Sequence, residues 1–592
     1  MERRVLLAIF LSFLVLYVYQ ALVVKPVTKS TAAPPGAPIA TGGGRAASAP
    51  SPAPTNPAAT TPAPLPIAAS ADVSGGQERD VRVENSDVIA VFTTRGARLK
   101  SLRLKRYLDH GGQPQELVEK EIESFPLPFT LQTANDQTTR VINGAVYEVG
   151  GEPAPGASGP VDLRFDYRDA GGLHAEKRFH FDASGYIITF SATVADGGGD
   201  QAPTIHWGPA VGDAGEVSRY SQKAEALLFA EADSKPQRLQ TKELSKQSVF
   251  DGDFRFAGVD DNYFMTVVLS PGPSKVSYQP VSIPPPANSK DPARELVAYS
   301  VQPLRGPQDL KFFSGPKDFD VLASIRTDLT QAINFGMFAV IVVPLLRSLK
   351  WVHGYIGNYG WSIVILTIII NAIMFPLRHK SAVSMRKMQE IQPEVKAIQD
   401  RYSKLKATDP AKQKMNQELM ALYRERGVNP AAGCVPMLLT FPVLFAMWAL
   451  LQTSIELRGA PWFGWIRDLS SHDPYYVLPV LMGATSFWQQ KMMPATGGDP
   501  AQQKMMMFMP LFMMFIFLWL PAGALIYYVV TNLWTIGQQY LTNHLIGPPN
   551  VKTMRPAAER RLKRVGAGKT QQAAVNDRIG GGGKTEAAAN DL

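Results

Sequence analysis

Long runs without Asp, Glu, Lys or Arg constrain the fold of this chain more than any other feature. Five of them lie in its C-terminal half, and a sixth, Val5 to Val24, lies near the N-terminus. Such runs are typical of segments that cross a hydrocarbon core of about 30 Å. The five later runs are 355–376, 435–452, 476–490, 505–520 and 522–545. The pattern predicts a polytopic α-helical membrane protein with six transmembrane helices, five of which form a core.

The N-terminal run indicates a retained anchor within residues 1–25. The basic start at Arg3 and Arg4 would also suit a cleaved signal peptide, but the apolar part is too long and no small-x-small cleavage site follows it. Residues 26–75 are rich in Pro, Ala, Thr, Ser and Gly. They cannot bury enough apolar surface to fold, so a linker is predicted.

Residues 76–318 have the period of β-structure. Apolar and polar residues alternate in "VRVENSDVIAVFTT" and "KRFHFDASGYIITFSATVAD", with Gly, Asn and Asp at the turns between such runs. This pattern predicts a large β-sandwich domain. The range contains no cysteine, so cysteine usage does not place the domain in an oxidising or a reducing compartment.

The segment 319–350 is predicted to be an interfacial amphipathic helix and not a crossing. Its apolar stretch, "INFGMFAVIVVPLL", is short, carries Pro344 and is followed by Arg347 and Lys350. Six crossings that start in the cytoplasm place residues 377–432 and the tail 547–592 there. Their net charges are +6 and +5, against −5 for residues 25–330, which fits the positive-inside rule. A seventh crossing would invert every later loop.

The two segments that are predicted to be cytoplasmic differ in their residue patterns. Residues 378–430 have apolar residues at helical spacing and predict a helical hairpin, although a solvated basic linker pair stays open. The basic tail 547–592 could contact anionic lipids or ribosomal RNA, or simply be solvated. Its "VGAGKT" and "GGGGKT" are not phosphate loops, because Lys563 and Arg578 stand where a glycine is required. Cys434 is interpreted as a small apolar filler.

Several polar residues lie inside the apolar runs. Tyr528, Asn532, Thr535 and Gln539 share one helix face, and Thr367, Asn371 and Arg378 share another unless Pro376 swings the end away. Gln489 and Gln490 close the fourth run. Lipid cannot satisfy such groups, so they should point at each other or at water. Two interpretations stay open, namely hydrogen bonds that join helices and the lining of a hydrated cavity.

Three long stretches resemble one family. They are "RGVNPAAGCVPMLLTFPVLFAMW", "LRGAPWFGWIRDLSSHDPYYVLPVLMG" and "QQKMMMFMPLFMMFIFLWLPAGALIYYVVTNLWTIGQQY". They resemble the YidC-type membrane protein insertases of Gram-negative bacteria, a family shared with mitochondria and thylakoids. The resemblance implies a periplasmic supersandwich and an insertase core, 351–546, with a hydrated groove. It also implies the bacterial inner membrane, with both termini cytoplasmic and residues 25–350 periplasmic.

The resemblance further implies an activity, a set of partners and a set of site residues. The implied activity is insertion and folding of nascent membrane proteins, alone or with the Sec translocon, by a non-enzyme without cofactor or metal. The ribosome and anionic lipids are further implied partners, and the chain is expected to be a monomer or Sec-associated. The expected groove residues are Thr367, Asn371, Arg378, Gln489, Gln490, Tyr528, Asn532, Thr535 and Gln539. The expected apolar slide for clients is Phe441, Phe445, Met482, Met509 and Phe512.

One residue departs from the family pattern. Asn371 stands where the family carries a positive residue, usually arginine, in the middle of the second span. A small-molecule secondary transporter is the first alternative function, but it would show repeated halves or mid-membrane charges, and neither is visible in the sequence. An assembly factor that holds helices without inserting them is the second alternative.

Overall fold

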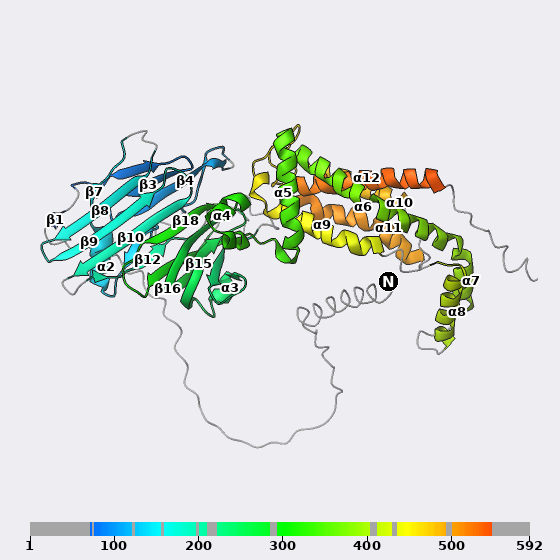
Figure 1. Cartoon of the computed structure of the whole chain (residues 1–592), viewed down its shortest axis with the longest axis horizontal. Helices are drawn as coiled ribbons and strands as arrows, with labels where there is room; N and C mark the ends of the chain where they lie inside the picture. The colour runs from blue at the N-terminus through cyan, green and yellow to red at the C-terminus, as the bar shows by residue number, and fades with distance from the viewer. Residues whose placement is uncertain are drawn as a thin grey trace, which may run out of the picture. The chain divides into compact units, whose positions relative to one another are not determined.

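The computed structural model describes residues 71–546. Within that range it leaves out 74–75, 110, 121–124, 155–158, 197–199, 210–221, 285–292, 403–410, 429–434 and 493–499. The predicted anchor, most of the predicted linker, Cys434 and the basic tail 547–592 therefore lie outside the described residues. Among the described residues, β-strands fill the first half and helices the second (Figure 1).

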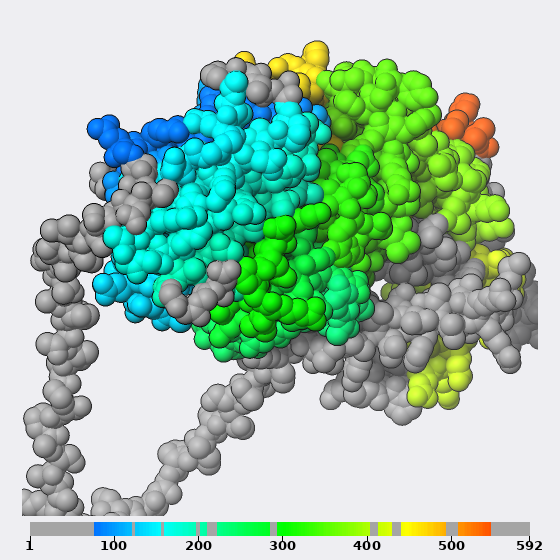
Figure 2. Space-filling view, turned by 60° about the vertical axis from the view of Figure 1, so that its left-hand side comes forward, coloured from blue at the N-terminus to red at the C-terminus, as the bar shows by residue number. Residues whose placement is uncertain are grey.

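Two antiparallel sheets form the β domain. The smaller has four strands in the order β2 (Asp80–Glu84), β3 (Val88–Thr93), β4 (Arg98–Leu108) and β5 (Pro114–Glu116). The larger is built of fourteen described strands along the path β1-β8-β9-β10-β18-β16-β15-β13-β14, with the others paired off it. These strands are β1 (Ala71–Val73), β6 (Thr130–Gln132), β7 (Glu148–Gly150), β8 (Val161–Asp169), β9 (Leu173–Phe181), β10 (Ile187–Asp196), β11 (Asp200–Gln201), β12 (Thr204–Trp207), β13 (Glu225–Ala230), β14 (Gln237–Leu239), β15 (Val249–Asp260), β16 (Phe264–Ile283), β17 (Arg294–Pro303) and β18 (Leu310–Pro316). Figure 2 shows residues of this sheet, cyan to green, as one continuous surface.

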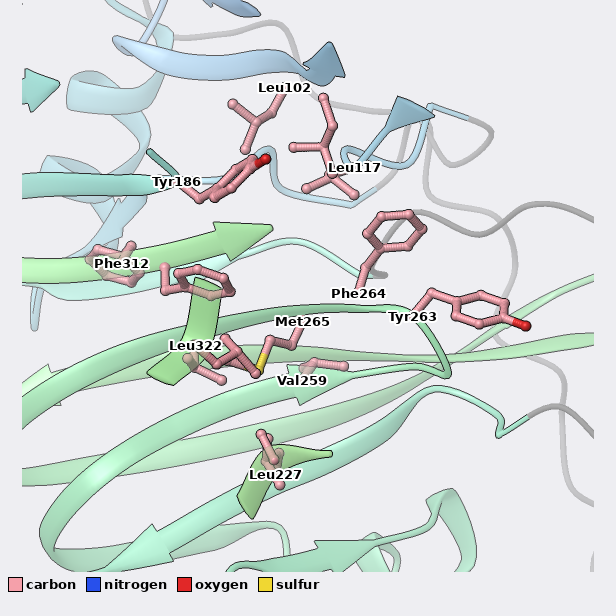
Figure 3. Close-up of a cluster of buried hydrophobic side chains, with 14 of the residues drawn as sticks. Leu102, Leu117, Tyr186, Leu227, Val259, Tyr263, Phe264, Met265, Phe312 and Leu322 are labelled. Carbon is pink, nitrogen blue, oxygen red and sulfur yellow. The ribbon is translucent and has the colours of Figure 1, made fainter. Parts of the chain in front are cut away.

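Aromatic side chains hold the two sheets together, which confirms the predicted β-sandwich. Phe92 of β3 lies against Phe179 of β9 with 4.6 Å between ring centroids, and Phe165 of β8 is 5.9 Å away. The alternating burial along β8 and β10 is the period that the sequence displays. Figure 3 shows another part of the core, in which Phe264, Met265 and Phe312 belong to one buried cluster with Leu322. The domain also contains two short helices, α2 (Asp136–Gly144) and α3 (Thr241–Leu244).

The domain begins earlier than predicted. β1 pairs antiparallel with β8 although Ala71–Val73 falls inside the range 26–75 assigned to the linker. The three-residue strand has too little apolar alternation to be recognised in a Pro and Ala rich tract, and the open edge of β8 supplies the hydrogen bonds that order it.

Two lysines are buried in the β domain. The Lys177 ammonium lies within 3.3 Å of the carbonyl oxygens of Gly96, Ala97 and Phe129, and burial lowers the pKa of Lys177 well below its usual range. Lys317 Nζ lies 2.8 Å from Asp260 Oδ2, and both side chains are fully buried. These contacts satisfy groups that would otherwise be costly to bury.

The segment 319–350 is not one helix as predicted. It contains α4 (Phe319–Ile325), the 3-10 turns η1 (Thr327–Ala332) and η2 (Gly336–Phe338), and the first part of α5 (Ala339–Ile356). Gly336, with φ of +64°, breaks the apolar stretch before α5 begins. Lys350 of α5 lies 2.7 Å from both Asp320 and Glu456. Interfacial placement stays a prediction, since Gly336–Ile356 is long and apolar enough to span a membrane.

Five helices coincide with the later apolar runs. They are α6 (Tyr359–Glu390), α9 (Val435–Thr453), α10 (Val477–Met492), α11 (Pro500–Ile516) and α12 (Ala522–Ile546), with η5 (Phe517–Trp519) after α11 and η4 (Ile455–Leu457) after α9. Figure 1 shows α5 running across the direction of α6, α9 and α12. By length and composition, Gly336–Ile356 and Tyr359–Glu390 are the two described segments that could cross a membrane, while Thr440–Thr453 and Met507–Trp519 are shorter apolar helices. The fold class, a membrane core with a large β domain, agrees with the prediction, and the number of six crossings stays a prediction.

The hairpin between the first two core helices is partly an extension of α6. That helix continues to Glu390, is followed by α7 (Gln392–Arg401), and α8 (Ala411–Glu425) packs beside α7. Ile391, Val395 and Val428 form its small buried core. The apolar residues at helical spacing that predicted the hairpin are the ones that face this core.

We expect Lys317→Met to destabilise the β domain. Among the described residues, the change leaves Arg238, 3.7 Å away, as the ion-pair partner of the buried Asp260 carboxylate. Breaking a buried ion pair costs about 3 kcal/mol or more. The loss of unfolding free energy is measured by urea unfolding of the full-length protein in detergent, with the circular dichroism of the β-sheet as the probe.

The matched control is Arg82→Met, which removes an exposed pair with Glu84 on the smaller sheet. Its cost should stay below about 1 kcal/mol. Equal midpoints for the two variants would contradict a structural role of the buried pair.

Candidate functional site: the polar faces of α6 and α12

Asn371 is satisfied within its own helix. The side chain is 2% exposed, its Nδ2 donates to the carbonyl oxygen of Thr367 at 2.8 Å, and its Oδ1 accepts from Arg378 Nη1 at 2.9 Å. Thr367 is also buried and donates from Oγ1 to the carbonyl oxygen of Ile363 at 2.6 Å. The structure therefore brings Thr367, Asn371 and Arg378 together, as their spacing predicts.

Arg378 is the charged member of this group. Because α6 continues through Pro376, the guanidinium reaches back two turns to Asn371 and is not swung away. A guanidinium has five N–H groups, and among the described residues Asn371 is the partner found for one of them. No carboxylate pairs with Arg378 in the described part of the chain. The hydroxyl of Tyr527 on α12 lies within electrostatic range.

In the polar row predicted on α12, one residue, Asn532, joins this helix to α10. We name Tyr528, Asn532, Thr535 and Gln539 the first polar row. Asn532 Nδ2 donates to Thr485 Oγ1 at 3.1 Å and to Ser486 Oγ at 2.7 Å, both on α10. Thr535 and Gln539 bond within α12, to Thr531 and Asn543. Tyr528 stacks on Phe517. At Asn532 the structure agrees with the interpretation of hydrogen bonds that join helices, and hydration along the rest of the row stays a prediction.

Gln489 and Gln490 occupy the last turns of α10. Both are half-buried, and neither has a hydrogen-bond partner among the residues that the structure describes. Thr485 and Ser486, the partners of Asn532, were not predicted from the sequence. A signal for them exists, since they are adjacent hydroxyl residues inside an apolar run, as Asn532 is an amide inside another.

A second polar row on α12 was missed by the sequence reasoning. We define it as Tyr527, Thr531, Trp534, Gln538 and Thr542, which follow a four-three-four-four spacing. Trp534 Nε1, Gln538 Oε1 and Thr542 Oγ1 are shielded from solvent and have no partner among the described residues. The row lies roughly a quarter turn around the helix from the first one at 100° per residue. Four of its five residues carry a hydroxyl or an indole and no amide, so they give a weaker signal in the sequence than the first polar row does.

The helix α12 runs beside α6, and Gly523, one turn before Tyr527 of the second polar row, makes the first contact. A Cβ on Gly523 of α12 would lie 3.4 Å from Ile363 of α6, and lower down Arg386 Nη2 donates to Asn543 Oδ1 at 3.1 Å. The helices are therefore parallel, and eight residues beyond the first contact Asn371 and Thr531 reach about the same depth at ~1.5 Å per residue. His379 Nδ1 on α6 is a further buried atom without a described partner.

The predicted apolar slide is mostly exposed, with one correction. Phe441 and Phe445 on α9 and Met509 and Phe512 on α11 are between 37% and 66% exposed. Met482 on α10 is only 3% exposed, so it is not available at this surface. Its helix packs closely there, because a Cβ on Gly483 would lie 2.9 Å from the sulfur of Met514.

One cluster in the β domain has the residue types of a metal site but does not fit one. Asp166, His174 and Glu176 lie close together. Arg164 already pairs with Asp166 at 2.9 Å and with Glu176 at 2.7 Å, so the carboxylates face a guanidinium. Arg168 and Arg178 pair with the same carboxylates, so three guanidinium groups already compensate their charge.

We expect Asn532→Leu to weaken the packing of α12 on α10. The change removes two hydrogen bonds between the helices and leaves the hydroxyls of Thr485 and Ser486 to their own helix. A loss of about 0.6 to 2 kcal/mol is expected for such a contact. Unfolding in mixed detergent and SDS micelles measures it, with the exposed Leu533→Ala as control. A variant as stable as the control would contradict the assignment.

Comparison with known proteins gives consistent matches over nearly the whole chain. The family model "YidC periplasmic domain" matches residues 80–348, and the model "60Kd inner membrane protein" matches residues 351–548. The membrane protein insertases YidC of Pelobacter propionicus and Geobacter metallireducens are each 34% identical, over 92% and 93% of this chain and the whole of theirs. A crystal structure of an active YidC insertase matches at 18% identity, a TM-score of 0.32, and 80% and 95% coverage. The chain belongs to the YidC family of inner membrane proteins.

Proposed function

We propose that this chain inserts membrane proteins by giving the polar end of a client a hydrated route between α6 and α12. Membrane protein insertion is the activity for which its relatives are named. Nascent membrane proteins are then its clients. Within this proposal the chain is not an enzyme, because the route changes no covalent bond.

One observation carries the proposed route. Four buried polar atoms, on Trp534, Gln538, Thr542 and His379, have no partner among the described residues. Each buried group left unpaired costs about 1 to 3 kcal/mol, and more where the surroundings are lipid. Water is the partner that satisfies them at rest. A client's own peptide groups can take the place of that water during passage.

The energetics fit a route without an energy source. A client span of about twenty apolar residues gains at most ~6 to 12 kcal/mol, while each charge drawn through a membrane core costs roughly 2.5 to 3.5 kcal/mol. One or two charges are tolerable, and four or five are not. The hydrated route shortens the dry path of the polar tail, so it lowers the barrier and leaves the equilibrium unchanged.

Exposed apolar side chains supply the second half of the proposal. The client's apolar span would move along Phe441, Phe445, Met509 and Phe512, which are the exposed members of the predicted slide. Met and Phe adapt to many apolar partners because they are unbranched or flat. The span therefore leaves the route toward lipid while its polar end stays in water.

The orientation and the partners belong to this proposal as well. The positive segments 377–432 and 547–592 favour a cytoplasmic position for both, with the β domain periplasmic. In this orientation the Thr542 end of the second polar row lies toward the cytoplasm, where clients are made. The ribosome and the Sec translocon are natural sources of such clients, and anionic lipid headgroups suit the basic tail.

Aqueous labelling tests the route directly. In a Cys434→Ala background, a cysteine at Gln538 should react with a membrane-impermeant maleimide added from the cytoplasmic side, because water reaches the second polar row. A cysteine at Leu533, which is 53% exposed and faces away from this row, should be protected by lipid. Equal protection at both positions would remove the hydrated route.

Insertion into vesicles that contain only this protein tests the energetics. A single-span client should insert with one or two charges in its tail, and yield should collapse at four or five, at about 2.5 to 3.5 kcal/mol per charge. Protease protection of the tail is the measurement, and empty vesicles are the control. No insertion of even the uncharged tail would point to an assembly factor that holds helices without inserting them.

A further inference from the structure

We propose that Arg386 of α6 and Asn543 of α12 form a latch, and that this latch must open before a client enters between the two helices. It closes the line of contact between α6 and α12, here called the seam, at the Thr542 end of the second polar row. The inference rests on the proposed function and adds a closed and an open state to it. The contacts in the structure are those of the closed state.

The latch joins the two helices through one amide oxygen. Asn543 Oδ1 accepts from Arg386 Nη2 on α6 at 3.1 Å and from Gln539 Nε2 on its own helix at 3.2 Å. The bond from Gln539 orients the amide, so its oxygen is presented to the guanidinium. Both hydrogen bonds are exposed to solvent, so water can replace either partner. The latch can therefore break and form again at little cost.

The polar atoms behind the latch are closed off from solvent. Thr542, the neighbour of Asn543, is 2% exposed. Its Oγ1 and the Oε1 of Gln538 are shielded from solvent and have no partner among the residues that the structure describes. A single water molecule can reach such atoms when the helices fluctuate, whereas a polypeptide needs the helices apart. The hydrated route thus requires a wider seam for a client than for water.

The two ends of the seam differ in what holds them closed. At the far end the contact is apolar and buried, because a Cβ on Gly523 would lie 3.4 Å from Ile363, which is fully buried. Separation there loses packing contacts that nothing replaces. At the latch, water replaces the broken hydrogen bonds and also reaches the unpartnered oxygens of Gln538 and Thr542. The seam should therefore open at the latch and stay closed at Gly523.

The reactivity of position 538 reports the state of the latch without any client. In a chain with Cys434→Ala and Gln538→Cys, Asn543→Leu should raise the rate of reaction with an impermeant maleimide about threefold or more, because the acceptor on α12 is lost. Asn543→Asp should lower the rate about twofold or more, since a carboxylate holds a guanidinium more strongly than an amide does. High salt should cancel that decrease.

Further variants separate the latch from a general loss of packing. Arg386→Leu should raise the rate as much as Asn543→Leu does, and the double variant should add nothing more, because both remove the same contact. Leu541→Ala is the matched control. It alters a side chain of the same turn that is 47% exposed, and it should leave the rate unchanged.

A covalent bridge tests whether insertion needs the opening. Arg386→Cys with Asn543→Cys, joined by a short cleavable dithiol crosslinker, should stop insertion of a single-span client into vesicles that contain only this protein, and cleavage should restore it. The control is Ile363→Cys with Gly523→Cys, whose bridge lies at the end of the seam that stays closed. That bridge should leave the yield unchanged.

The outcomes distinguish the latch from the proposed function. Equal labelling rates in the unmodified, Asn543→Leu and Asn543→Asp chains, or full insertion with the Arg386 and Asn543 positions bridged, overturns the latch and leaves the proposed function intact. Protection of position 538 in every variant, equal to that of Leu533→Cys, removes the hydrated route itself.

Discussion

The need of every polar group for a partner in a medium without water shapes the helical half of this protein. Two buried asparagines meet it in opposite ways. Asn532 bonds across to α10 and locks two helices together. Asn371 bonds within α6 and uses its remaining oxygen to hold a charge. The same residue type is thus structural at one position and part of the candidate site at the other, and only the neighbours distinguish the two.

The buried polar groups without a described partner are the feature that distinguishes α12 from a helix that only packs. A protein that only had to pack its helices would pair them, as α10 and α12 do along the first polar row. The second polar row keeps buried donors and acceptors beside an arginine that has no counter-ion among the described residues. Such groups are stable only when water or a passing chain completes them. A non-covalent transfer of polypeptide into lipid needs just this kind of incomplete surface.

Much of the fold follows from the sequence, because lipid and β-pleating each impose a strong pattern on it. Long uncharged runs predict α6, α9, α10, α11 and α12, and the alternation of apolar and polar residues predicts the β domain. The division of 319–356 into α4, two turns and α5 does not follow, since Gly336 acts through backbone conformation. The sequence also does not show which helix covers each polar face. Spacing shows that Asn532 and Gln539 share a side, but it cannot show that α10 covers it. Met482 was misplaced because an apolar residue looks alike whether it faces lipid or a neighbouring helix.

The uninterrupted length of α6 has a mechanical consequence. The helix begins at Tyr359, just after Gly357, whose φ of +70° ends α5, and it runs for 32 residues to the base of the helical hairpin. At 1.5 Å per residue it is a rod of about 48 Å. A tilt of about 5° at Gly357 therefore displaces Glu390 by roughly 4 Å. A small widening at the Asn371 level would therefore become a larger displacement of the arms α7 and α8.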